Sequence, residues 1–172
     1  MPQQDKPLEQ RFPGFASFKI AYKAYHQEQD KEKSLLYLRA AARLDDSPYY
    51  RLGAAVVALK LKQVDDAAME LEGLLGHPGL DPHHRRLVAF YFAIALDVQG
   101  RHIEALPHYQ SVVNDQNAWP SLKEAADSWI QEGFERDGLS SLDFDLKYFD
   151  GIRYPKREAR PHLLKLPFWM QT

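Results

Sequence analysis

Residues 91–113 read YFAIALDVQGRHIEALPHYQSVV and contain two apolar stretches on either side of Gly100. The stretch before this glycine, which reaches back to residue 87, is apolar on nearly every side and predicts a helix that is covered from several directions. The stretch after it is more amphipathic, with apolar residues at helical spacing: Ile103, Leu106, Tyr109, Val112 and Val113. Gly100 fits the left-handed position just beyond a helix C-terminus. We therefore expect a helix, a tight turn and a second helix that packs back on the first.

Small residues mark where two such helices would approach most closely, as Ala93 and Ala105 do here. The arrangement recurs upstream, because Ser34 and Ala67 occupy the position of Ala105 in two earlier helical pairs, at separations of 33 and 38 residues. The extra residues of the longer interval fall in the loop 77–84. A helical pair that repeats with a period in the mid-thirties is typical of a solenoid, in which each unit buries its face on its neighbours.

On these positions the chain resembles the tetratricopeptide repeat (TPR) family over residues 15–119. The unit 86–119 matches the family signature best, at Phe92, Ala93, Leu96, Gly100, Ala105, Tyr109 and Val112. The units 15–48 and 47–81 match in the same phase, and the first helix of the middle unit reads one or two residues longer. No unit has the family's tryptophan, and the closing proline is shifted or missing. The resemblance implies an all-α, TPR-like α-solenoid of three helix-turn-helix units, and an ordinary antiparallel helical bundle is the alternative.

The pattern changes after the third unit. Pro120 suits the first turn of a helix, and the apolar face that follows predicts a capping helix for the repeats. We thus divide the chain into a flexible N-terminus (1–14), a repeat domain with its capping helix (15–136) and a non-repeat C-terminal extension (137–172). Alternating residues at 142–149, followed by Asp-Gly, predict a short β-hairpin in the extension.

The last residues of the extension are unusually apolar and include Phe168 and Trp169. Exposed to water, each of these two rings would forgo about 1.5–3 kcal/mol of burial free energy. We expect them to be tail-docking residues that pack along the chain's own repeats. The alternatives are that they dock on a partner, or that they occupy the groove of the repeats until a partner displaces them.

Composition excludes several classes of function. The 172 residues carry a net charge of −2 and no cysteine, so disulfides and thiolate zinc sites are ruled out, and nothing in the net charge favours nucleic acid. The polar start is no secretory signal, and the longest apolar runs are too short to cross a bilayer. We therefore expect a cytoplasmic protein with no membrane insertion and no nucleic-acid partner.

Residues with catalytic or metal-binding chemistry form no recognised arrangement. His83 and His84 are adjacent and would point about 100° apart on a helix, so we expect solvated loop histidines and no metal site. The acidic cluster at 143–150 lacks the mid-loop glycine of a calcium site. No phosphate-binding, dinucleotide-binding or nucleophile-elbow motif occurs. We predict no enzyme activity, no catalytic residue and no cofactor.

The resemblance implies a concave groove lined by the first helix of each unit, where TPR proteins generally bind peptide segments. The positions that correspond to it are Lys19, Lys23, Tyr50, Arg51, Phe90, Tyr91, Ile94 and Asp97. The family's clamp for a C-terminal carboxylate is not expected, because Lys23 and Arg51 replace two of its asparagines. The groove would run from cationic to apolar and aromatic, which suits a peptide with an acidic part and an apolar anchor.

The sequence thus predicts a non-enzymatic protein-protein interaction module, an adaptor or dedicated chaperone that binds a protein or peptide partner. The alternative is a structural subunit, or scaffold, of a larger complex whose C-terminal tail docks on a neighbour. A homodimer is left open, since exposed aromatic residues could support one.

Overall fold

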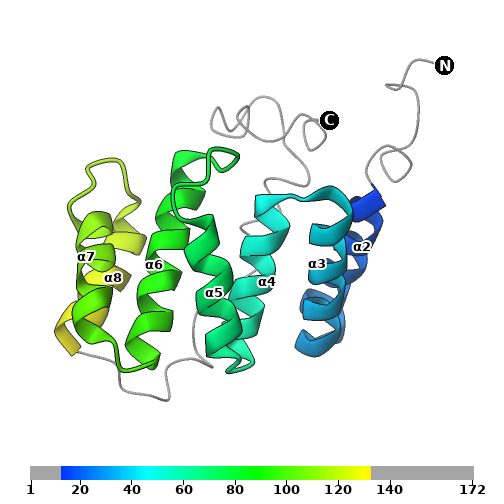
Figure 1. Ribbon diagram of the computed structural model, residues 1–172, viewed down its shortest axis with the longest axis horizontal. Helices are drawn as coiled ribbons and strands as arrows, with labels where there is room; N and C mark the ends of the chain where they lie inside the picture. Colours follow the sequence, from blue (N-terminus) through cyan, green and yellow to red (C-terminus); the bar gives the residue numbers. More distant parts are fainter. Residues whose placement is uncertain (1–12, 133–172) are drawn as a thin grey trace. The chain divides into compact units, whose positions relative to one another are not determined.

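The computed structural model describes residues 13–132, and this part of the chain is helical with no strand (Figure 1). The all-α class predicted from the sequence is confirmed to that extent. The predicted β-hairpin and the rest of the C-terminal extension lie outside the described residues. The elements are α2 (Pro13–Lys23), the π-helical turn η2 (Ala24–Glu28), α3 (Lys31–Asp45), α4 (Pro48–Lys60), α5 (Val64–Leu74), α6 (Pro82–Val98), α7 (His102–Val113) and α8 (Pro120–Glu132).

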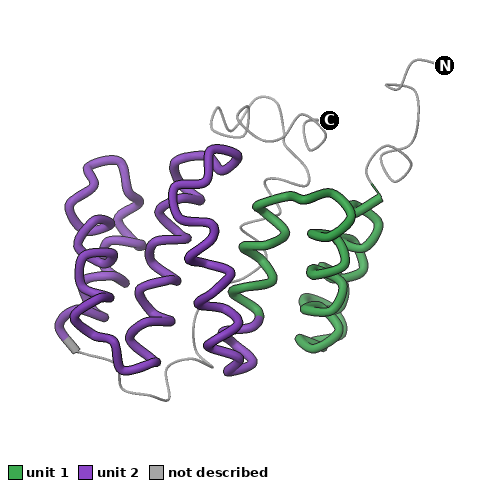
Figure 2. The backbone as a smooth tube through the Cα atoms, in the orientation of Figure 1, with its two compact units in different colours: residues 1–57, 143–172 green, residues 58–142 purple. Residues whose placement is uncertain are grey.

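The described residues fall into two compact units, 13–57 and 58–132 (Figure 2). The division lies within α4. Unit 1 therefore contains α2, η2, α3 and most of α4, and unit 2 contains the end of α4 and the helices α5 to α8. Within residues 13–132 no helix is both long and apolar enough to cross a bilayer.

Unit 1 is built on the packing of α2 against α3. The apolar residues of the two helices recur at helical spacing and are buried together: Phe15, Phe18, Ala21, Leu35, Leu38 and Ala41. At their closest approach the buried Ser34 hydroxyl donates a hydrogen bond of 2.9 Å to the carbonyl oxygen of Ala21. The small residue predicted at this crossing therefore lies against the backbone of the first helix.

Gly14 marks a second close approach in unit 1. A Cβ atom added to this glycine would lie 2.4 Å from a carboxylate oxygen of Asp45 and 2.7 Å from the carbonyl oxygen of Ala41. Contacts this short do not occur in folded proteins, so the start of α2 and the end of α3 can pack at this distance only with glycine at position 14.

Unit 2 contains the hairpin that the sequence predicts most directly. The helix α6 packs on α5 and α7, and α8 packs on α7. Residues 87–97 of α6 are buried with the exception of Ala89, as expected for a helix that is apolar on every side. Ala93 and Ala105 are both fully buried.

The turn between α6 and α7 has the geometry expected of it. Gly100 adopts φ +81°, and its N–H donates to the carbonyl of Asp97 at 2.9 Å. The N–H of Arg101 donates to the carbonyl of Leu96 at 2.8 Å. These two bonds form a Schellman motif with glycine in the left-handed position, which confirms the predicted role of Gly100.

Helix α4 ends in the same motif without a glycine. Lys62 adopts φ 63° and donates its N–H to Leu59, while the N–H of Gln63 donates to Ala58 at 2.9 Å. A side chain in the left-handed region costs about 1–2 kcal/mol. The turns at Gly100 and Lys62 therefore share one backbone geometry, and only the turn at Lys62 carries the cost of a side chain in the left-handed region.

Candidate functional site

The predicted peptide-binding lysines lie on α2 and are exposed. Lys19 and Lys23 are one helical turn apart and so share a face of the helix. Ile20 lies between them in sequence with 40% of its surface exposed. The Lys19 ammonium is 5.7 Å from the centroid of the Phe15 ring, within the range of a cation-π contact. This part of α2 thus presents two cations and one accessible apolar side chain.

The predicted groove residues of α4 differ in accessibility. Tyr50 is fully buried, and its ring stacks on Phe18 at a centroid distance of 5.1 Å. Burial, reinforced by the charge of Asp45, raises the pKa of the Tyr50 hydroxyl, so this group stays protonated. Arg51 is half-buried. Tyr50 therefore belongs to the core of unit 1, and Arg51 is partly accessible.

The four predicted groove residues of α6 are all buried: Phe90, Tyr91, Ile94 and Asp97. Phe90 contacts the ring of Tyr91 at 5.2 Å and that of Tyr109 at 6.2 Å between centroids. The physical reason is the same all-round apolar pattern that predicted coverage of this helix. The role of these four residues in peptide binding stays a prediction. The accessible cations of the predicted groove, Lys19, Lys23 and in part Arg51, all belong to unit 1.

Asp97 is the centre of a polar cluster at the C-terminal end of α6. One of its buried carboxylate oxygens accepts a hydrogen bond of 3.0 Å from the Tyr109 hydroxyl. The other contacts Nδ1 of His102, whose side chain is 58% exposed. A buried carboxylate needs such partners to offset the cost of leaving water. Asp97 was predicted as a groove residue, and this cluster was not predicted, because the partners of Asp97 lie 5 and 12 residues further along the chain.

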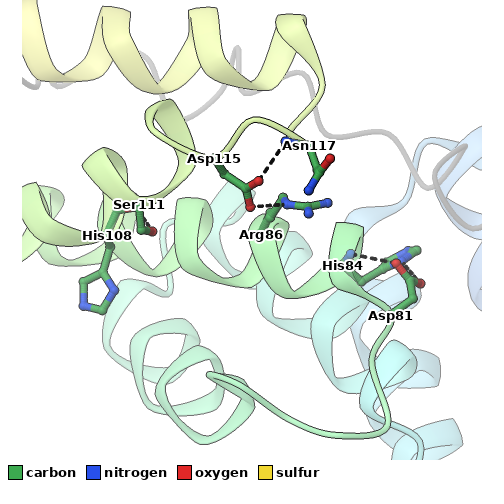
Figure 3. Close-up of polar contacts among 7 residues, drawn as sticks. All are labelled: Asp81, His84, Arg86, His108, Ser111, Asp115 and Asn117. Carbon is green, nitrogen blue, oxygen red and sulfur yellow. Dashed lines mark hydrogen bonds and ion pairs between the residues drawn. The ribbon is translucent and has the colours of Figure 1, made fainter.

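A second cluster lies at the N-terminal end of α6, around Asp81 (Figure 3). One Asp81 oxygen accepts the backbone N–H of His84 at 3.1 Å, and the other lies 2.5 Å from Nδ1 of the same histidine. Asp81 is thus the N-cap of α6, a role for which its side chain is well suited. His83 stacks on Trp119 with ring centroids 3.8 Å apart and planes 23° apart.

The expectation of solvated loop histidines is wrong for His83 and His84, which are both buried. The helix begins at Pro82, so both residues lie in its first turn. There the capping carboxylate of Asp81 meets one ring and Trp119 covers the other. The Asp-Pro pair at 81–82 is a helix-start signal, so the predicted loop 77–84 ends before this pair.

Arg86 connects α6 to the loop before α8 (Figure 3). Its Nε donates to one oxygen of Asp115 at 2.6 Å, and the backbone N–H of Asn117 donates to the other at 2.9 Å. These two hydrogen bonds, that of Arg86 first, hold the pKa of Asp115 below its usual range. The Arg86–Asp115 ion pair therefore holds this loop against α6, and we assign it a structural role.

The clusters together do not form a metal centre. Among residues 13–132, no three histidine, aspartate or glutamate side chains are grouped so that they could hold a metal ion. The predicted tail-docking residues Phe168 and Trp169 lie outside the described part of the chain, as does the acidic cluster at 143–150. Comparison of the chain with family models, with curated proteins and with solved structures finds no significant match.

Proposed function

We propose that this chain is a TPR-like solenoid protein of three hairpin repeats and a capping helix that acts without catalysis as an interaction module in the cytoplasm. As an adaptor or dedicated chaperone it binds a peptide segment in the predicted groove, through the part of that groove that α2 provides. The observation that carries the proposal is the exposed pair of lysines, Lys19 and Lys23, on the first helix of the first hairpin.

The repeat character is supported by the helical hairpins themselves. The small residue at the crossing is buried in each of the three predicted pairs, as Ser34, Ala67 and Ala105. In the first pair it hydrogen-bonds directly to the backbone of the partner helix. In the third pair the Schellman turn at Gly100 closes the hairpin with the geometry that the repeat requires.

The chemistry of the bound segment follows from the surface of α2. Two ammonium groups one turn apart attract carboxylates, and the exposed part of Ile20 offers an apolar contact between them in sequence. The partner is therefore a segment with acidic residues and an apolar anchor. The aromatic end of the predicted groove, on α6, is buried and does not extend this binding surface.

A peptide-display selection against the full chain tests the proposal. We expect enriched peptides that combine Asp or Glu with a large apolar residue. Reversal of both charges (Lys19→Glu with Lys23→Glu) should weaken the binding of an enriched peptide by about tenfold or more, because attraction becomes repulsion at two sites.

The matched control is the pair Lys31→Glu and Arg43→Glu on α3, which changes the net charge by the same amount at two exposed positions of the other helix. This variant should retain binding within about twofold at moderate ionic strength, where distant charges are screened. The proposal fails if no peptide is enriched, or if both double variants weaken binding equally.

A further inference from the structure

Exposed apolar and acidic side chains lie on α5 and α7 of unit 2, away from the lysines of α2 in sequence. Its apolar members are Met69 on α5, which is 74% exposed, and Ile103 on α7, which is 85% exposed. Leu106 lies one turn after Ile103 and is also exposed. Large apolar side chains this accessible are typical of an interaction site.

We name Met69, Ile103 and Leu106, with the polar residues around them, the α5–α7 face, and a hydrogen bond joins its α5 part to the turn before α7. Asp65, one turn before Met69, accepts a hydrogen bond of 2.9 Å from Gln99 in the turn that leads into α7. The hydrogen bond from Arg101 to Glu104 and, to a smaller extent, the charge of Glu72, one turn after Met69, raise the pKa of Arg101 in the same turn. Met69 therefore lies between two acids of α5, one of which is hydrogen-bonded to the turn before α7.

The charge of the α5–α7 face is acidic. Helix α5 has the sequence VDDAAMELEGL, with acids at positions 65, 66, 70 and 72 and no lysine or arginine. Glu104 adds a carboxylate at the start of α7. Arg101 is the adjacent cation, and both of its hydrogen-bonded groups, Gln99 and Glu104, belong to the same surface.

This charge decides among the possible occupants. Two copies of the chain would bring like charges together if they met through this face in a symmetric dimer. An anionic lipid surface would be repelled for the same reason. A polypeptide segment that alternates basic and apolar residues complements both the acids and the exposed side chains.

We propose that the α5–α7 face is a docking site for a basic, amphipathic polypeptide segment of a partner protein. The site is separate from the lysines of α2 and selects the opposite charge. It does not depend on the proposed function of those lysines.

The probe is a fluorescent synthetic peptide of leucine and lysine at amphipathic helical spacing, titrated into the full chain and followed by fluorescence anisotropy. A second peptide with glutamate in place of lysine reports the charge preference. We expect the lysine peptide to bind and the glutamate peptide to bind at least about tenfold more weakly.

Two variants locate the site. Ile103→Asp should weaken binding of the lysine peptide by about tenfold or more, since a central apolar contact is lost. Leu36→Asp is the matched control, because Leu36 is an exposed leucine on the second helix of the first hairpin. The affinity of this variant for the lysine peptide should stay within about twofold of that of the parent chain. Circular dichroism melts establish that both variants are folded, and Met69→Asp replaces Ile103→Asp if the latter is not.

Equal loss in Leu36→Asp and Ile103→Asp, or tight binding of the glutamate peptide, would overturn the proposal. So would unchanged binding in Ile103→Asp. Sedimentation that shows a dimer of the full chain, dispersed by Ile103→Asp, would overturn it in favour of a second copy as the occupant.

Discussion

Pro107 lies inside α7, and its replacement by alanine should stabilise the protein. Proline has no N–H, so the carbonyl of Ile103 lacks the donor that residue 107 would otherwise supply one turn later. Within a helix, proline is about 3 kcal/mol less favourable than alanine. The side chain of Pro107 is exposed, so its removal leaves no cavity in the core.

Two effects make the expected gain in stability smaller than this difference of about 3 kcal/mol. Alanine allows the unfolded chain more conformations, which returns about 0.4–1 kcal/mol to the unfolded state. The start of α7 is exposed at Ile103, so water can partly satisfy the free carbonyl. We expect a net increase of about 2 kcal/mol in the free energy of unfolding of the chain. For a chain of this size that corresponds to a rise in Tm of roughly 4–8 °C.

Urea and thermal unfolding, followed by circular dichroism, measure the change. Pro120→Ala is the matched control, because Pro120 begins α8, where the first backbone N–H groups have no partner within the helix in any case. Its effect should stay within about 0.5 kcal/mol. A destabilising Pro107→Ala, or equal shifts in the two variants, would refute the reasoning from the missing hydrogen bond.

Three further predictions concern the turns and the titratable groups. Gly100→Ala should lower the free energy of unfolding by about 1 kcal/mol, whereas Lys62→Gly, in the same left-handed position of the other Schellman turn, should not lower it, and urea titrations of both compare them directly. The Arg86–Asp115 pair lowers a carboxylate pKa, so its stabilising effect is present above about pH 4 and is lost as the pH falls through the lowered value. Melts of Arg86→Met between pH 7 and pH 3 should lack that part of the acid dependence, and an unchanged pH profile would contradict the assignment. Burial lowers the pKa of His108, so its contribution to stability falls as the pH drops below about 6.5, where the unfolded state binds the proton first. His108→Gln should therefore lose less stability than the parent chain between pH 7 and pH 5.

The hairpin around Gly100 could be predicted from sequence because every signal for it is local. The apolar periodicity gives each helix and its buried face, the small residues mark the crossing, and only a glycine fits the left-handed turn without strain. The same reasoning placed Ser34 at the crossing of the first pair, where its hydroxyl donates to the carbonyl of Ala21, since small residues at a fixed phase lie where two helices approach most closely. These features depend on a few neighbouring residues and so can be read in order along the chain.

Accessibility and polar contacts needed the tertiary structure. Asp97 and Tyr109 are 12 residues apart, and His83 and Trp119 lie on different elements, so no periodic pattern links either pair. Ile94 and Lys23 each lie 11 residues before the small residue of the following helix, Ala105 and Ser34, yet Ile94 is buried and Lys23 is exposed. By itself the sequence determined which segments form helices and which faces of them are apolar. Which polar groups are paired, and which apolar side chains are left for a partner, was decided only by the tertiary structure, because burial depends on how elements distant in the chain pack together.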